Sequence, residues 1–103
     1  MVVGSTPDSV KRLRRAAGAE VEVVAEAISR DEALAKADQT RVDVAVIDGE
    51  TTDAGALAES LRVAGLAVVL IGGVGADVDS NGDLADALPG AITRALMARR
   101  PPR

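Results

Sequence analysis

Short apolar runs alternate with segments of helical periodicity along most of the chain. Four of the runs have the length and composition of strands, at residues 1–3, 21–29, 42–48 and 66–73. Residues 44–47 are continuously apolar, as expected of a strand that is covered on both faces. Because strands that alternate with helices are typical of βα units, the pattern predicts an α/β fold with a parallel sheet.

Three helices are predicted between these strands. In the first, Ser5 or Thr6 caps the N-terminus, Pro7 suits the first turn, and Gly18 ends the helix. Asp31 is expected to cap a second helix over residues 32–39. The third helix is expected over residues 54–65, where leucines recur at helical spacing.

The pattern weakens after residue 73. Residues 74–82 have no helical stripe and indicate a loop, and residues 83–88 are compatible with a short fifth strand. A last helix is then expected to begin at Pro89. The alternative is one helix over residues 84–99, but an interior proline would cost about 3 kcal/mol, which favours the break. Residues 100–103 have the composition of a linker stub.

Composition removes most kinds of reactive site. The 103 residues suit a single domain, and they include no aromatic side chain, no Cys and no His. Disulfides, thiolate catalysis, the usual zinc and iron ligands and imidazole acid–base chemistry are therefore excluded. The chain also has no ring that could stack on a base or a flat cofactor. Carboxylates, hydroxyls, Lys and Arg are the reactive groups that remain.

Charge and hydropathy narrow the class of partner. A net charge of −4 argues against nucleic-acid binding by the domain as a whole. No apolar run is long enough to span a bilayer, and the N-terminus does not resemble a signal peptide, so a cytoplasmic protein is expected. The basic run at residues 11–15 could face nucleic acid or an acidic partner, but we interpret it as the solvated face of the first helix.

Residues 21–50, "VEVVAEAISRDEALAKADQTRVDVAVIDGE", closely resemble the middle of a response-regulator receiver domain. In that family a strand of the type VEVVGEA leads to a helix of the type DGEEAL, and a strand of the type PDVVLLD ends in the phospho-accepting aspartate. Residues 82–96, "GDLADALPGAITRAL", resemble the end of receivers attached to LuxR-type DNA-binding domains. The resemblance implies a doubly wound, three-layer α/β domain over residues 1–99. Its parallel sheet would have the flavodoxin-like order 2-1-3-4-5, with the fourth helix reduced to the loop at residues 74–81.

The resemblance also assigns positions to the family's reactive residues. Asp48 matches the phospho-accepting aspartate. The acidic pair that holds Mg²⁺ in the family matches Gly4 and Ser5, neither of which is a carboxylate. The family's Thr or Ser matches Gly72, and its Lys matches Ala85. Asp48 is thus a vestigial phospho-acceptor position whose metal-binding and phosphoryl-binding partners have been replaced.

Two further absences do not depend on the alignment. No lysine follows Lys36, and no aromatic residue could serve as the family's switch. A regulatory or dimerisation module without enzymatic activity, metal or cofactor is therefore implied, as the N-terminal part of a cytoplasmic regulator with a possible DNA-binding domain beyond residue 103. This step from fold to role rests on analogy.

Other functions fit parts of the same sequence. A stand-alone interaction or targeting module, such as the pseudo-receiver portion of a localisation or secretion ATPase, is one alternative. The glycine-rich residues 71–77 could instead bind a small ligand at a pocket lined by Gly72, Gly73 and Asp48, although they lack a complete phosphate-binding motif. Glu50 and Asp53 lie near enough to Asp48 in sequence for a weak cation site, but acidic loops are usually just solvated.

A symmetric dimer is expected through the C-terminal helix and the neighbouring sheet edge. That helix carries more apolar residues than a single packed stripe requires: Ala91, Ile92, Ala95, Leu96 and Met97. Of these, Ile92, Leu96 and Met97 are the candidate interface residues. Loss of the fourth helix would also uncover apolar surface on the strand at residues 66–73. Exposed apolar area of this kind is usually covered by a partner.

Overall fold

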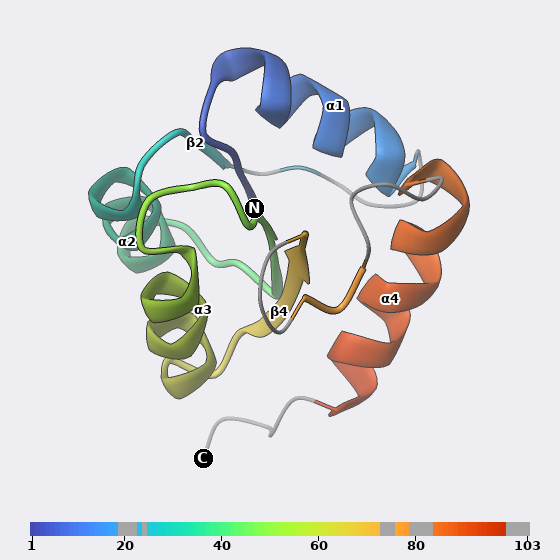
Figure 1. The fold of residues 1–103 in the computed structure, drawn as a ribbon. Helices are drawn as coiled ribbons and strands as arrows, with labels where there is room; N and C mark the ends of the chain where they lie inside the picture. The colour runs from blue at the N-terminus through green and yellow to red at the C-terminus, as the bar shows by residue number, and fades with distance from the viewer. Residues whose placement is uncertain (19–22, 24, 73–75, 79–83, 99–103) are drawn as a thin grey trace.

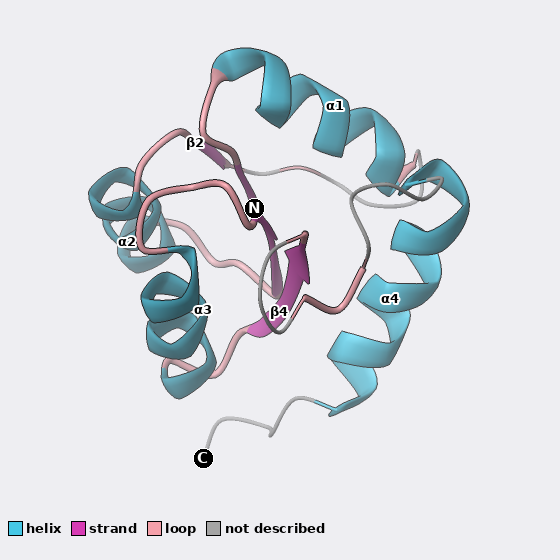
Figure 2. Ribbon diagram, viewed as in Figure 1, coloured by secondary structure: helices cyan, strands magenta, loops and turns pink. Residues whose placement is uncertain are grey.

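The computed structural model describes residues 1–18, 23, 25–72, 76–78 and 84–98 of the 103-residue chain. Strands and helices alternate along it (Figures 1 and 2). The elements are β1 (Val2–Val3), α1 (Pro7–Ala17), β2 (Glu26–Ala27), α2 (Arg30–Gln39), β3 (Val44–Asp48), α3 (Ala54–Val63), β4 (Ala67–Ile71) and α4 (Leu84–Ala98). The predicted α/β class is confirmed.

The four described strands form one parallel sheet in the order β2-β1-β3-β4. Val2 of β1 pairs with Glu26 of β2 on one side and with Val46 of β3 on the other. The predicted order 2-1-3-4-5 is correct for its first four strands. The prediction of a fifth strand at residues 83–88 is wrong. Residue 83 lies outside the described residues, and residues 84–88 are helical.

Helices cover both faces of this sheet and make three layers, with α1 and α4 on one face and α2 and α3 on the other (Figure 1). The alternation of side chains along β3 and β4 divides the core between the faces. Val46 and Val69 pack beneath α1 and α4, whereas Ile47 and Leu70 pack beneath α2 and α3. Both strands are buried on both faces, as their continuous apolar sequence predicts.

The ends of the first two helices follow from local chemistry. Thr6 is the N-cap of α1, and its Oγ1 accepts a hydrogen bond of 3.1 Å from the Ser9 backbone N–H. Gly18 ends the helix with φ of 86°, a value that favours glycine. The cap of α2 is Ser29, whose Oγ accepts from the Glu32 N–H at 3.2 Å. The predicted cap at Asp31 is therefore wrong by two residues, and Asp31 lies in the first turn of the helix.

Helix α4 begins at Leu84 and runs through Pro89, so the predicted break at this proline is wrong. The alternative of one continuous helix, which the interior proline made unfavourable, is therefore the structure that forms. Leu84 and Leu88 are both buried in the core beside the sheet. Burial of two leucines stabilises the helix by roughly 3–6 kcal/mol, which offsets the cost of about 3 kcal/mol for an interior proline. Tertiary packing therefore overrides the local preference.

A short segment borders β4 where a fifth strand would lie. Val78 makes a single parallel bridge to Ile71, and its carbonyl accepts a hydrogen bond of 2.8 Å from the Gly72 N–H. The Leu70 N–H donates to a carboxylate oxygen of Asp77 at 2.9 Å. These bonds satisfy polar groups at the carboxyl end of β4 without a regular strand.

The expectation that β4 exposes apolar surface is wrong as well. Every residue of β4 is buried, because α3 covers one face of the strand and α4 covers the other. The expected linker stub at residues 100–103 lies outside the described residues, as does much of the loop expected at residues 74–82. Among the described helices, none has the length and apolar character needed to cross a membrane.

Candidate functional site

Asp48 ends β3 at the carboxyl edge of the sheet, where the N-terminus of α1 also lies. Its carboxylate is half-buried and accepts two hydrogen bonds. The Ser9 hydroxyl donates to Oδ2, and the Glu50 backbone N–H donates to Oδ1 at 3.0 Å. Both oxygens therefore have a neutral partner, and the carboxylate is bound into the loop between β3 and α3 and to the first turn of α1.

Ser9 is a site residue that the sequence analysis did not identify. It lies 39 positions before Asp48 and is the third residue of α1. In a parallel α/β sheet, the first turn of the helix that follows β1 lies at the carboxyl ends of the strands. Its position in "TPDSV" could therefore have indicated a contact with the end of β3.

Gly4 lies directly after β1, and its surroundings exclude a side chain. A Cβ built on Gly4 would lie 2.9 Å from the Val10 backbone nitrogen and 3.0 Å from the Ser9 Oγ. These are closer approaches than real Cβ atoms normally make. An aspartate could not occupy position 4 unless the start of α1 moved. Ser5, the second position matched to the acidic pair, is exposed.

The carboxyl ends of β3 and β4 are joined without space for a side chain. The Gly49 N–H donates to the Ile71 carbonyl at 2.7 Å. A Cβ on Gly49 would lie 2.1 Å from the Gly72 carbonyl oxygen. Gly72 itself has φ of 70°, where glycine is favoured, and offers no hydroxyl to a ligand. Gly72 therefore lies against Gly49, the residue that directly follows Asp48 at the end of β3.

Ala85 does not lie at the end of a strand. It belongs to the first turn of α4 and is exposed beside basic side chains of α1, with which it lines a surface cavity. The strand at whose end the family's lysine was expected is therefore absent from the described residues, and position 85 is helical. The broader observation that no lysine follows Lys36 is unaffected.

The acidic residues near Asp48 have other surroundings. Asp53 is the N-cap of α3 in a left-handed conformation, with φ of 58°, and its carboxylate lies 3.6 Å from the Arg30 guanidinium. Glu50 is exposed. Within the described ranges, no group of three or more acidic side chains is placed to hold a metal ion.

A shallow cavity of about 360 Å³ does lie at the carboxyl edge, beside β1 and β2 rather than β4. Ser5, Ser29, Arg30, Thr51 and Asp53 are among its lining residues. Thr51 is buried, and its Oγ1 has no hydrogen-bond partner in the described part of the chain. This cavity is not the ligand pocket that was expected from Gly72, Gly73 and Asp48, because neither Gly72 nor Asp48 lines it. Gly73 lies outside the described residues.

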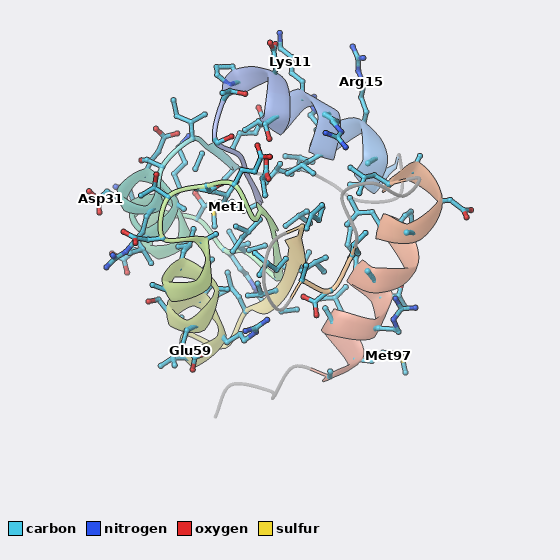
Figure 3. All side chains as sticks on the ribbon, viewed as in Figure 1. Met1, Lys11, Arg15, Asp31, Glu59 and Met97 are labelled. Atoms are coloured by element: carbon cyan, nitrogen blue, oxygen red, sulfur yellow. The ribbon has the colours of Figure 1, made fainter. Side chains whose placement is uncertain are left out.

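The three residues expected at a dimer interface differ in their accessibility. Ile92 is only 3% exposed and belongs to the core beneath α4, so its surface role is excluded in the folded monomer. Leu96 is 37% exposed and Met97 is 82% exposed. Figure 3 shows Met97 projecting outward from the C-terminal part of α4.

Comparison of the chain with protein-family models, with curated proteins and with solved structures finds no match in any of the three.

Proposed function

We propose that this chain is a receiver-like regulatory and dimerisation module that does not accept a phosphoryl group. The observation that supports it is the environment of Asp48. The carboxylate lies where the family places its acceptor, and both of its oxygens are hydrogen-bonded to neutral groups, the Ser9 hydroxyl and the Glu50 N–H. Transfer of a phosphoryl group to a carboxylate depends on cations that neutralise the developing charge.

Crowding at the edge of the sheet supports the same proposal. The acidic pair that would hold Mg²⁺ has no space at position 4, because Ser9 and Val10 lie against Gly4. The space that a carboxylate at position 4 would need is therefore occupied by the first turns of α1. A cation that entered would meet one carboxylate and a hydroxyl, a poor set of ligands for Mg²⁺.

The test is incubation with acetyl phosphate and Mg²⁺, followed by intact-mass measurement. No phosphoryl adduct is expected on the chain or on Asp48→Asn, under conditions in which a receiver with its full acidic pair is phosphorylated. Beryllium fluoride should likewise leave the amide NMR spectrum around Asp48 unchanged. An adduct that forms on the chain and is lost in Asp48→Asn would overturn the proposal.

Dimerisation is the second part of the proposed function. The C-terminal ends of α3 and α4 expose three large apolar side chains, which we name the C-terminal patch: Val63, Leu96 and Met97, with exposed fractions of 81%, 37% and 82%. A groove of about 520 Å³ lies between these helix ends, and Leu66, Val68 and Ala95 contribute to its lining. A two-fold interface on this patch would bring two effector domains of a cytoplasmic signalling or transcriptional regulator together.

Light scattering over a range of concentrations tests the dimer. Met97→Asp would place a charge in the interface and should shift the protein to monomer without unfolding it, because Met97 is largely exposed. Ile28→Asp is the matched control, since Ile28 is another exposed apolar residue at the opposite edge of the sheet. A protein that is monomeric at every concentration, or a dimer that tolerates Met97→Asp, would contradict this part of the proposal.

A further inference from the structure

Helix α1 concentrates positive charge on an acidic protein. Four of the chain's 12 basic residues lie within five consecutive positions, and all four are exposed: Lys11, Arg12, Arg14 and Arg15. We name them the basic ridge. Figure 3 shows Lys11 and Arg15 projecting from the outer side of α1, whereas Asp31 and Glu59 project from α2 and α3. Although the net charge is −4, the charges are unevenly distributed, and a basic helix lies on one face of the molecule.

Local stabilisation explains only part of this ridge. Arg14 and Arg15 lie in the last turn of α1, where cations interact favourably with the helix dipole. Lys11 lies in the middle of the helix and gains little from that effect. Lys11 and Arg15 are also four positions apart, a spacing at which like charges destabilise a helix by roughly 0.2–0.5 kcal/mol. Within the part of the chain that the structure describes, neither residue forms a salt bridge.

The ridge borders a groove. Lys11, Arg12 and Arg15 line a cavity of about 540 Å³ between α1 and the start of α4, together with Ala16 and Ala85. The two alanines leave space between the helices, and the three basic side chains border it together with Asp8. Ala16 is buried and Ala85 is exposed, so a partner in the groove could contact the Ala85 side chain and the cations along the rim.

We propose that the basic ridge binds an acidic helical segment of a partner protein. Four residues of α-helix span about 6 Å, so Lys11 and Arg15 are separated along the axis by the distance between acidic side chains at i and i+4 of a second helix. Such a helix, placed along the groove, would present its carboxylates to both cations at once. Its narrow charged stripe would also avoid the acidic side chains elsewhere on the molecule.

Nucleic acid fits this surface less well. A DNA duplex has one negative charge per roughly 1.7 Å of its axis, and it extends far beyond a single helix. Asp8 lies on the same helix and lines the same groove, and the remainder of the chain is acidic overall. Asp8 would meet either ligand, but a duplex would also bring its phosphates against the acidic remainder of the chain, whereas a short acidic helix would not extend beyond the groove.

Fluorescence anisotropy with the full chain tests the proposal. The probe is a labelled, alanine-rich helical peptide of about 20 residues with glutamates at i and i+4. At roughly 50 mM salt it should bind, and the affinity should fall as salt is raised. A peptide of the same composition with its glutamates spread around the helix should bind at least fivefold more weakly. The variant Lys11→Glu with Arg15→Glu should lose at least tenfold in affinity.

The matched control is Arg41→Glu with Arg94→Glu, which changes the net charge equally at two exposed positions away from the ridge. It should change the affinity for the peptide less than twofold. Circular dichroism verifies that each variant is folded, and Lys11→Gln with Arg15→Gln replaces the charge reversal if that variant unfolds. Equal losses in the two variants, no binding at low salt, or tighter binding of a 20-base-pair duplex than of the peptide would each overturn the proposal.

Discussion

At the scale of single residues, the carboxyl edge of the sheet is determined by close packing. Gly49 and Gly72 contact each other directly after the ends of β3 and β4. The backbones of the two residues approach so closely that a Cβ at position 49 would overlap the Gly72 carbonyl, and this arrangement requires glycine at position 49. Asp48, beside Gly49, is a hydrogen-bond acceptor for the Ser9 hydroxyl and the Glu50 backbone N–H.

Gly49→Ala should destabilise the protein by about 3 kcal/mol, because the new Cβ would overlap the Gly72 carbonyl and force β3 and β4 apart. Urea denaturation followed by circular dichroism measures the change in the free energy of unfolding. Gly55→Ala is the control, since no atom lies within 4 Å of a Cβ at this position in α3. It should stabilise by about 0.5–1 kcal/mol through helix propensity. Equal effects of the two substitutions would contradict the packing argument.

At the scale of elements, the sequence predicts best where period, length and apolar content agree. The continuous apolar runs of β3 and β4 predict buried parallel strands. A cap at Ser5 or Thr6, with Pro7 and Gly18, predicts the bounds of α1, and the structure selects Thr6. The failure at residues 84–88 has a physical cause. Leu84 and Leu88 suit a helix as well as a strand, and a local rule about proline cannot weigh the free energy of burying both leucines.

For the candidate site, the sequence predicts the position of the aspartate but not its tertiary contacts. The position of Asp48 at the end of a buried strand follows from the sequence pattern alone. Its hydrogen bond from Ser9 joins elements 39 residues apart, and the contact of Gly49 with Gly72 depends on the register between β3 and β4. Strand register and the packing of α1 against the sheet are tertiary properties, so local periodicity could not supply them.

Pro89→Ala should stabilise α4. The proline occupies the sixth position of the helix, where it supplies no backbone N–H, and alanine would restore the donor. The free energy of unfolding is expected to rise by about 1–3 kcal/mol, with part of the gain lost to the greater freedom of the unfolded chain. Pro7→Ala is the control, because proline is favoured at the first position of a helix.

Thermal unfolding of both proline variants, followed by circular dichroism, gives the comparison. Pro89→Ala should raise the melting temperature, and Pro7→Ala should leave it unchanged or lower it. A decrease for Pro89→Ala would mean that the proline fixes a bend on which the packing of α4 depends, and that its cost to the helix is smaller than we infer.

At the scale of the whole molecule, the N-terminus is part of the core. Met1 is buried against the face covered by α2 and α3, and its ammonium group donates a hydrogen bond of 2.8 Å to the Val44 carbonyl. Burial lowers the pKa of this amine below its ordinary value of 8.0, and the nearby Asp43 carboxylate partly opposes the shift. The folded protein therefore holds this proton less tightly than the unfolded chain does.

The sign of the pH dependence follows from that difference. Stability rises with pH wherever the unfolded chain binds more protons, which here is the interval from the lowered pKa of the folded amine up to about 8.0. Above that interval both states have lost the proton, and the gain is complete. With no His and no Cys in the chain, no side chain ordinarily titrates between roughly pH 6 and 8 to obscure the effect.

For a chain that begins at Met1, the free energy of unfolding should increase as the pH is raised toward 8 and should then level off. Urea denaturation at a series of pH values and constant ionic strength measures it. Asp43→Asn removes the charge that opposes the shift, so the pKa of the folded amine should fall further and the rise should extend over a wider interval. Stability that is constant or falls across this range would show that the amine is solvated, and that β1 enters the sheet without burying the start of the chain.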